Sequence, residues 1–186
     1  GGNNVSVGHD ALRLNTTGSN NTAVGLDALR ANTTGLENTA VGSGSLDANT
    51  VGQYNVALGR NSLGANVDGS RSTAVGYAAL AAQEPDSASN VNNVAVGFHA
   101  LNASTTGAEN VAVGSESLEA NTTGNENVAV GYRALEANTT GSTNTGLGDR
   151  ALASNTSASN NTAVGNNALA ENTTGGTNVA IGSLCL

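Results

Sequence analysis

Small apolar residues recur along the whole chain at a fixed spacing, separated by Asn, Thr and Gly. The run Asn21-Thr22-Ala23-Val24-Gly25 is followed by Ala28-Leu29 and then by the polar run Asn32-Thr33-Thr34-Gly35. The same order begins again at Asn38, 17 residues after Asn21. A constant period of this kind is typical of repeat proteins, in which each unit forms one coil and stacks on the next.

The repeat accounts for residues 1–186 as a single array of about ten and a half units. One unit, residues 72–92, has 21 residues instead of 17, and we place its four additional residues near residues 83–86. Pro85 lacks a backbone N–H and suits a surface loop, so we expect the additional residues to bulge outward without breaking the stack. The units begin at Asn4, Asn21, Asn38, Asn55, Ser72, Asn93, Asn110, Asn127, Asn144, Asn161 and Asn178.

Positions in the repeat are numbered from 1 at the first residue of each unit. Positions 1 to 5, for example Asn127–Gly131, predict a short β-strand ended by glycine. Positions 6 to 12, for example residues 132–138, are too few for an independent helix and predict either a second strand or a single helical turn held by its neighbours. Positions 12 to 15, usually Asn-Thr-Thr-Gly, predict a turn. We expect the aliphatic residue of position 4 and the leucine of position 9 to point inward.

These elements predict an all-β repeat protein, a β-solenoid or parallel β-roll with one 17-residue coil per repeat. A single unit contributes one Val and one Leu to a core, each stabilising by about 1.5–3 kcal/mol, against an ordering cost of about 1–2 kcal/mol per residue. Stacking therefore has to supply the stability. At about 4.8 Å per coil the rod would be about 50 Å long. Because its core would be thin, we expect further burial between copies, in a homotrimer or a head-to-tail filament.

Composition excludes several classes of protein. The chain has 28 Asn, 25 Gly and 21 Thr, no Trp or Lys, and a net charge of −8. Its six basic residues are isolated arginines, so no basic patch is available to neutralise nucleic-acid phosphates. No apolar run approaches the roughly 20 residues of a membrane span. Cys185 is the one cysteine, so an internal disulfide framework is excluded.

The strand motif carries a resemblance to a known family. Asn178-Val179-Ala180-Ile181-Gly182, and the Asn-Val-Ala-Val-Gly runs that begin at Asn93, Asn110 and Asn127, resemble the head repeats of trimeric autotransporter adhesins, which carry Ser/Asn-Val-Ala-Ile-Gly motifs. This resemblance implies a left-handed parallel β-roll of three chains on a bacterial surface, used for attachment. The family repeat is usually shorter, and the Ala-Leu-x-Ala-Asn-Thr-Thr-Gly half is not its usual partner. The 17-residue repeat also resembles those of phage-type tail-fibre proteins.

Candidate reactive residues are few and dispersed. His9 and His99 occupy neighbouring positions of units five apart, which places them about 24 Å from each other. Cys185 takes a position that is Ala or Ser in most units and is interpreted as a small packed side chain, with an inter-chain disulfide as the alternative. No Cys/His spacing of a zinc or haem site occurs. The sequence therefore predicts no catalytic, cofactor-binding or metal-binding residues, and no enzymatic activity.

Stacked carboxylates are a weaker candidate for a metal site. Like charges in adjacent coils repel unless solvent or a cation separates them, and Ca²⁺ binds such oxygen ligands. We interpret these residues as a solvated acidic edge, with a calcium site as the alternative. The pairs that share a position in adjacent units are Asp10 and Asp27, Glu109 and Glu126, and Glu119 and Glu136.

Ten Asn-x-Ser/Thr sequons, a pattern that can accept N-linked glycans in secreted proteins, occur in the chain. Asn and Thr are also the residues that such turns require, and stacked Asn side chains can bond to one another, so the turn chemistry is the favoured interpretation. The sequon asparagines are Asn4, Asn15, Asn20, Asn32, Asn102, Asn121, Asn138, Asn155, Asn160 and Asn172.

The pattern as a whole favours a structural role. We expect a rod or filament segment of an extracellular fibre, displayed on a cell or virion surface, adhesive and self-associating. Its expected partner is itself, with a host or surface receptor as a second. One alternative is an ice-binding β-solenoid, because the chain is rich in Thr and poor in charge; the adjacent doublet Thr16-Thr17 argues against it, since its side chains would diverge. A phage tail-fibre shaft is the other alternative.

Overall fold

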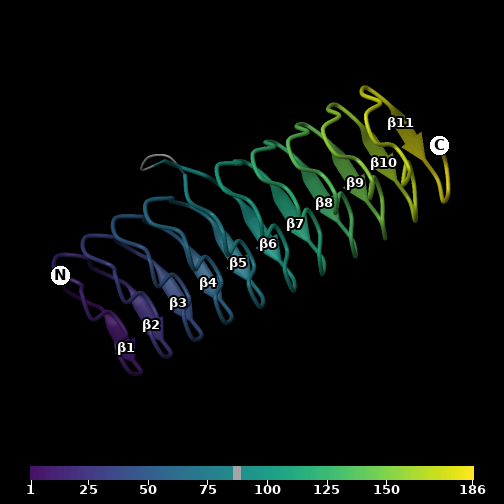
Figure 1. Ribbon diagram of the computed structural model, residues 1–186. Coiled ribbons are helices and arrows are strands. Elements are labelled where there is room, and N and C mark those ends of the chain that lie inside the picture. Colours follow the sequence, from purple (N-terminus) through teal and green to yellow (C-terminus); the bar gives the residue numbers. More distant parts are fainter. Residues whose placement is uncertain (86–88) are drawn as a thin grey trace.

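The computed structural model describes residues 1–85 and 89–186, and they form one regular stack of coils (Figure 1). Each coil contributes one three-residue strand to a single parallel sheet, in which the strands follow sequence order from β1 to β11. The predicted β-solenoid is therefore confirmed. The strands are β1 (Val5–Val7), β2 (Thr22–Val24), β3 (Thr39–Val41), β4 (Val56–Leu58), β5 (Thr73–Val75), β6 (Val94–Val96), β7 (Val111–Val113), β8 (Val128–Val130), β9 (Thr145–Leu147), β10 (Thr162–Val164) and β11 (Val179–Ile181).

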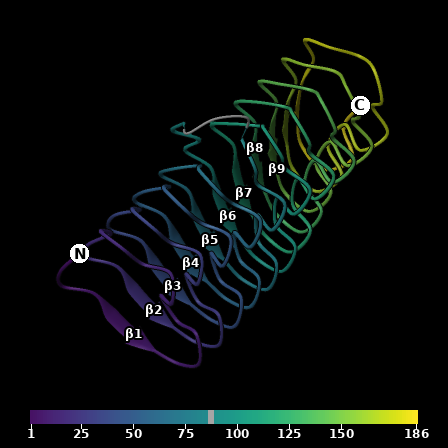
Figure 2. The ribbon, with the colours of Figure 1, turned by 60° about the vertical axis from the view of Figure 1, so that its left-hand side comes forward.

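The register of the sheet follows the repeat. Ala23 pairs with Ala40, 17 residues later, and the same offset holds between the other regular units. Between β5 and β6 the offset rises to 21, because Ala74 pairs with Ala95. The sheet is therefore continuous across the longer unit, and Figure 2 shows the coils following one another along the whole rod.

The strand buries the residue of position 3, and the expectation that position 4 points inward is wrong. Ala112 is fully buried, whereas its neighbour Val113 is 36% exposed. Successive side chains of a strand point to opposite faces, so only the middle residue of each strand from β2 to β11 enters the core, while Ser6 in β1 is exposed. There is room for little more than a methyl group, because a Cβ added to Gly146 at this position would lie 3.4 Å from the Leu135 side chain.

The leucines of position 9 do point inward. Leu118 and Leu135 are fully buried, as the sequence predicted. They pack with the small residues of positions 3 and 8, for example Ala129 and Ala134. The core is thus a column of leucines flanked by two columns of mostly alanine.

Positions 6 to 12 form neither a second strand nor a helical turn, so both expectations for this segment are wrong. Arg133 and Leu135 have φ values of 54° and 53°, which is the left-handed region, and a helix needs φ near −63°. Their N–H groups bond to neighbouring coils, as when Leu135 donates to the Ala151 carbonyl at 2.9 Å. A left-handed leucine costs about 1–2 kcal/mol, and burial of its side chain, about 1.5–3 kcal/mol, offsets that cost.

Two columns of buried asparagine run through the other half of the stack. At position 1, the Asn55 N–H donates to Oδ1 of Asn38 at 3.0 Å. At position 12, Nδ2 of Asn49 donates to Oδ1 of Asn32 at 2.8 Å. The carbonyl of Gly52 accepts from both Asn38 and Asn49, at 2.8 and 3.2 Å. The bonding between stacked asparagines that the sequence suggested is therefore present.

Two of the four residues that the sequence assigns to the bulge, Gln83 and Glu84, belong to the regular coil instead. Gln83 is fully buried and takes the place of the position-12 asparagine, where its Nε2 donates to Oδ1 of Asn66 at 3.0 Å. The next residue, Glu84, still bonds in register to the Thr105 carbonyl. Regular pairing has returned by Val91, whose carbonyl accepts from the N–H of Glu109. The excess chain thus falls between Glu84 and Val91. Of the residues assigned to the bulge, Asp86 lies outside the described residues.

Candidate interaction surface

The outward face of the sheet, made of positions 2 and 4, is the most prominent apolar surface of the rod. Its position-4 column is aliphatic in every coil and partly or largely exposed, with Val24 half-buried, Val113 36% exposed and Ile181 73% exposed. Neither column contains a charged residue. Contiguous exposed apolar surface of this kind marks an interaction site in soluble proteins. The column comprises Val7, Val24, Val41, Leu58, Val75, Val96, Val113, Val130, Leu147, Val164 and Ile181.

Position 2 adds either a valine or a threonine to this face. In β6, β7 and β8 both outward residues are valine, so the centre of the face is entirely aliphatic. Threonine takes position 2 in β2, β3, β5, β9 and β10, whereas β1, β4 and β11 have valine there. Within residues 1–85 and 89–186, these hydroxyls make no hydrogen bond to protein, whereas Thr122 at position 13 donates to the Thr139 carbonyl at 3.0 Å. The unbonded hydroxyls belong to Thr22, Thr39, Thr73, Thr145 and Thr162.

Aromatic side chains extend the apolar surface around the corner at position 6. Tyr77 and Phe98 stack with their ring centroids 5.5 Å apart, and His99 stacks on Phe98 at 4.1 Å. The guanidinium of Arg60 lies over the other end, 6.0 Å from the Tyr77 ring centroid. Because these rings already cover one another, the stack holds neighbouring coils together beside the longer unit.

The two histidines lie in separate environments, in β1's coil and β6's coil. His99 Nδ1 is 3.1 Å from Oε1 of Glu119, and the ring is half-buried. His9 is exposed, with Nδ1 3.6 Å from Asp10. They share no ligand or partner among the described residues.

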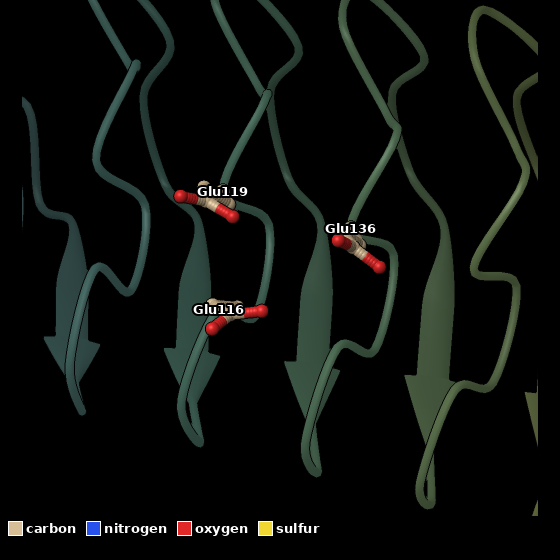
Figure 3. A group of neighbouring side chains, drawn as sticks. All are labelled: Glu116, Glu119 and Glu136. Carbon is tan, nitrogen blue, oxygen red and sulfur yellow. The ribbon is translucent and has the colours of Figure 1, made fainter.

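One acidic pair of the sequence analysis belongs to a tighter cluster. Glu116 and Glu119 lie on one coil and Glu136 on the next (Figure 3), and one carboxylate oxygen from each lies within 4.8 Å of the others. Arg133 supplies the positive charge: its Nε lies 2.6 Å from Glu116 and 3.5 Å from Glu136. The hydrogen bond to Glu116 raises the pKa of the Arg133 guanidinium. The geometry is therefore that of an ion-pair network that already holds its cation.

A second such network lies near the start of the rod. Arg30 bridges Asp27 and Asp47, at 3.8 and 3.5 Å. Burial raises the pKa of the Asp47 carboxyl, and Arg30 opposes that rise. Asp10 occupies the same position as Asp27 in the preceding coil, and it pairs instead with Arg13 at 3.7 Å. Most acidic residues of these two networks are therefore paired with arginine, and the sequence did not predict this pairing.

The remaining candidate residues of the sequence have no partner, among the residues that the structure describes, that indicates a binding or catalytic role. Glu109 and Glu126 form no ion pair within the described part of the chain. The Cys185 thiol is free and half-buried, and it donates to the Gly182 carbonyl at 2.9 Å.

An open groove of about 610 Å³ crosses the coils of β7 to β10, and Ala120 and Ala137 are among the residues that line it. The sequence had not predicted this groove.

No protein-family model, curated protein or solved structure matches this chain significantly. The resemblance to trimeric autotransporter heads and to tail-fibre repeats therefore depends on the repeat motif alone. In residues 1–85 and 89–186, no helix is long and apolar enough to cross a bilayer.

Proposed function

We propose that this chain is a structural rod segment of an extracellular fibre, and that copies of it associate through the outward face of the sheet. The observation that carries the proposal is the uninterrupted aliphatic column from Val7 to Ile181, exposed on one side of a regular rod. Its display on a cell or virion surface and its adhesive use are supported by the repeat motif, which resembles surface fibres of both kinds.

A second copy of the chain is the occupant that fits this face best. The net charge is −8, so a contact without charged residues reduces the repulsion between two copies by keeping their like charges apart. Positions 2 and 4 provide such a contact along the full length of the rod. Because each coil repeats the same small set of side chains, copies in register present matching rows to one another. Lateral packing also supplements a core made of alanine and leucine, which is thin for a rod of this length.

Two kinds of assembly are compatible with the repeat, a lateral homotrimer and a head-to-tail filament. A homotrimer places one outward face from each rod around a common axis, as the resemblance implies. A head-to-tail filament would use the ends of the stack instead, where strand edges invite addition. The outward face favours the lateral assembly. A host or surface receptor would then bind a side of the rod that the assembly leaves exposed.

Sedimentation equilibrium of the purified chain tests the proposal. We expect a species whose mass is a multiple of 18.1 kDa. Val113→Arg, in the centre of the outward face, is expected to give a folded monomer with an unchanged circular dichroism spectrum. Thr123→Arg, an exposed position-14 residue on another side of the coil, is the control and should leave the assembly intact. A folded wild-type chain that stays monomeric at high concentration would refute the proposal.

The unbonded threonine hydroxyls favour one second candidate, ice binding. Thr22 and Thr39 pair in register on the outward face, as do Thr145 and Thr162, so they form ordered rows of hydroxyl and methyl groups. The valine-only centre of the face at β6 to β8 makes this candidate the weaker one. A thermal-hysteresis measurement separates the two: activity in a monomeric chain supports ice binding, and its absence in an oligomer supports the rod.

A further inference from the structure

The structure divides the ten sequons into two groups. In eight of them the asparagine amide already donates a hydrogen bond from Nδ2, usually to the carbonyl of position 15 or to a neighbouring asparagine. In the other two, Asn20 and Asn160, the residue is exposed and its amide makes no hydrogen bond within the described residues. The eight bonded asparagines are Asn4, Asn15, Asn32, Asn102, Asn121, Asn138, Asn155 and Asn172.

The bonded amides are unsuited to act as nucleophiles. Nδ2 of Asn138 donates to the Gly141 carbonyl at 2.9 Å and to Oδ1 of Asn121 at 2.9 Å, and the residue is fully buried. Breaking these bonds inside the stack leaves buried polar groups without partners, which is costly. Modification there requires the coil to open.

At Asn20 and Asn160 the local chain presents the sequon outward. Asn20 is exposed, Asn21 is buried in the asparagine column, and Thr22 is half-exposed on the sheet face. Asn160 and Thr162 repeat this arrangement around the buried Asn161. Both acceptor asparagines have left-handed φ values, 59° and 63°. The amide and the hydroxyl of each sequon are therefore both accessible while the coil stays closed.

We propose that Asn20 and Asn160 are acceptor sites for N-linked glycosylation, and that the other eight sequons are not. The co-substrate is a sugar activated at its anomeric carbon as a phosphate or pyrophosphate ester. A transferase lets Nδ2 attack that carbon: the N–C bond forms, the C–O bond to phosphate breaks, the phosphate ester leaves with the electron pair, and the amide proton passes to a base of the transferase. Thr22 and Thr162 lie on the outward face of the sheet, so we expect modification of the folded chain before the assembly proposed above covers that face.

The first test uses the folded chain with Val113→Arg, which keeps the outward face uncovered, together with a soluble N-glycosyltransferase and a nucleotide-activated hexose, followed by intact mass and peptide mapping. We expect two additions, at Asn20 and Asn160. Thr22→Val and Thr162→Val should each remove one addition without disturbing the fold, because valine occupies the same position in β6, β7 and β8. The unfolded chain serves as the control for enzyme activity.

A gain-of-site variant makes the test sharper. Thr143 is exposed with a φ of 58° and precedes the buried Asn144 and the half-exposed Thr145, so Thr143→Asn creates a third sequon of the same geometry. We expect a third addition in this variant. Incubation of the same folded chain with a lipid-linked sugar donor and its transferase tests the other source of sugar, and should modify the same residues. Failure to modify Asn20 and Asn160, or modification of Asn32 or Asn138 in the folded chain, overturns the proposal.

Discussion

Ser72 donates a hydrogen bond of 3.1 Å from its hydroxyl to Oε1 of Gln83, inside the stack. These two residues occupy positions 1 and 12 of the longer unit, which are asparagine in most other coils. Gln83 Oε1 also accepts from Nδ2 of Asn93 at 3.1 Å. The longer side chain of glutamine thus fills the space that serine leaves, and it bonds directly to side chains of the position-1 column, whereas in other coils the two columns share the carbonyl of position 15.

This relationship predicts that the two substitutions are coupled. Gln83→Asn shortens the side chain and leaves Ser72 without its acceptor, so we expect a loss of about 1–3 kcal/mol. In the double variant Ser72→Asn/Gln83→Asn both columns regain their regular residues, and much of the loss should be recovered. A double-mutant cycle from urea unfolding measures the coupling. Additive effects of the two substitutions would contradict this account.

The leucine column predicts an unusual order of stability among variants substituted at Leu118. Leu118 is fully buried and has a φ of 49°. Leu→Ile usually costs less than about 1.5 kcal/mol in a core, but β-branched residues are strongly disfavoured at positive φ. We therefore expect Leu118→Ile to destabilise the chain more than Leu118→Met does. Leu118→Ala should cost about 2–5 kcal/mol through the cavity it leaves. Thermal unfolding of the three variants gives the order, and equal losses for Ile and Met would be inconsistent with a left-handed leucine.

The period, the single array and the inward leucines were predictable because they follow from residues that recur in every coil. The left-handed backbone at positions 7 and 9 was not. Only glycine reports positive φ reliably, and here the chain uses Asp10, Leu12 and Arg133 for it. Helix propensity of Ala and Leu therefore suggested a helical turn that the backbone does not form.

The outward face could have been predicted from one further step. Asn110 and Ala112 lie two residues apart on a strand and so share a face, and Asn110 belongs to a buried column. Val113 must then point outward. Invariance alone did not distinguish an inward column from an outward one, since both repeat in every coil. The arginine that neutralises Glu116 and Glu136 comes from a variable position, so the repeat pattern carried no signal for it.

Substitution of glycine by alanine is expected to change stability in opposite directions at Gly114 and Gly64. Gly114 has a φ of +135°, and a Cβ there would lie 2.4 Å from the carbonyl oxygen of Gly131. Gly64 lacks positive φ, and its nearest neighbour would be 3.4 Å away. We expect Gly114→Ala to destabilise by at least about 1–3 kcal/mol through backbone strain and Gly64→Ala to stabilise by about 0.4–1 kcal/mol. Unfolding midpoints check both, and tolerance of Gly114→Ala would argue against the close approach of the coils.

Asp47 predicts how stability changes with pH. Burial raises the pKa of its carboxyl, with Arg30 opposing, so the folded chain holds this proton more tightly than the unfolded chain does. Its contribution is therefore fully present below the unfolded pKa, near 4, and is lost as the pH rises through the folded value. Asp47→Asn removes this pH-dependent loss of stability. The free energy of unfolding of the variant, relative to that of wild type, should therefore increase from about pH 3.5 towards pH 6. Urea unfolding across this range measures the difference, with the exposed Asp149→Asn as the control for removing one negative charge. If the advantage of Asp47→Asn falls as the pH rises, Arg30 outweighs burial at this carboxylate.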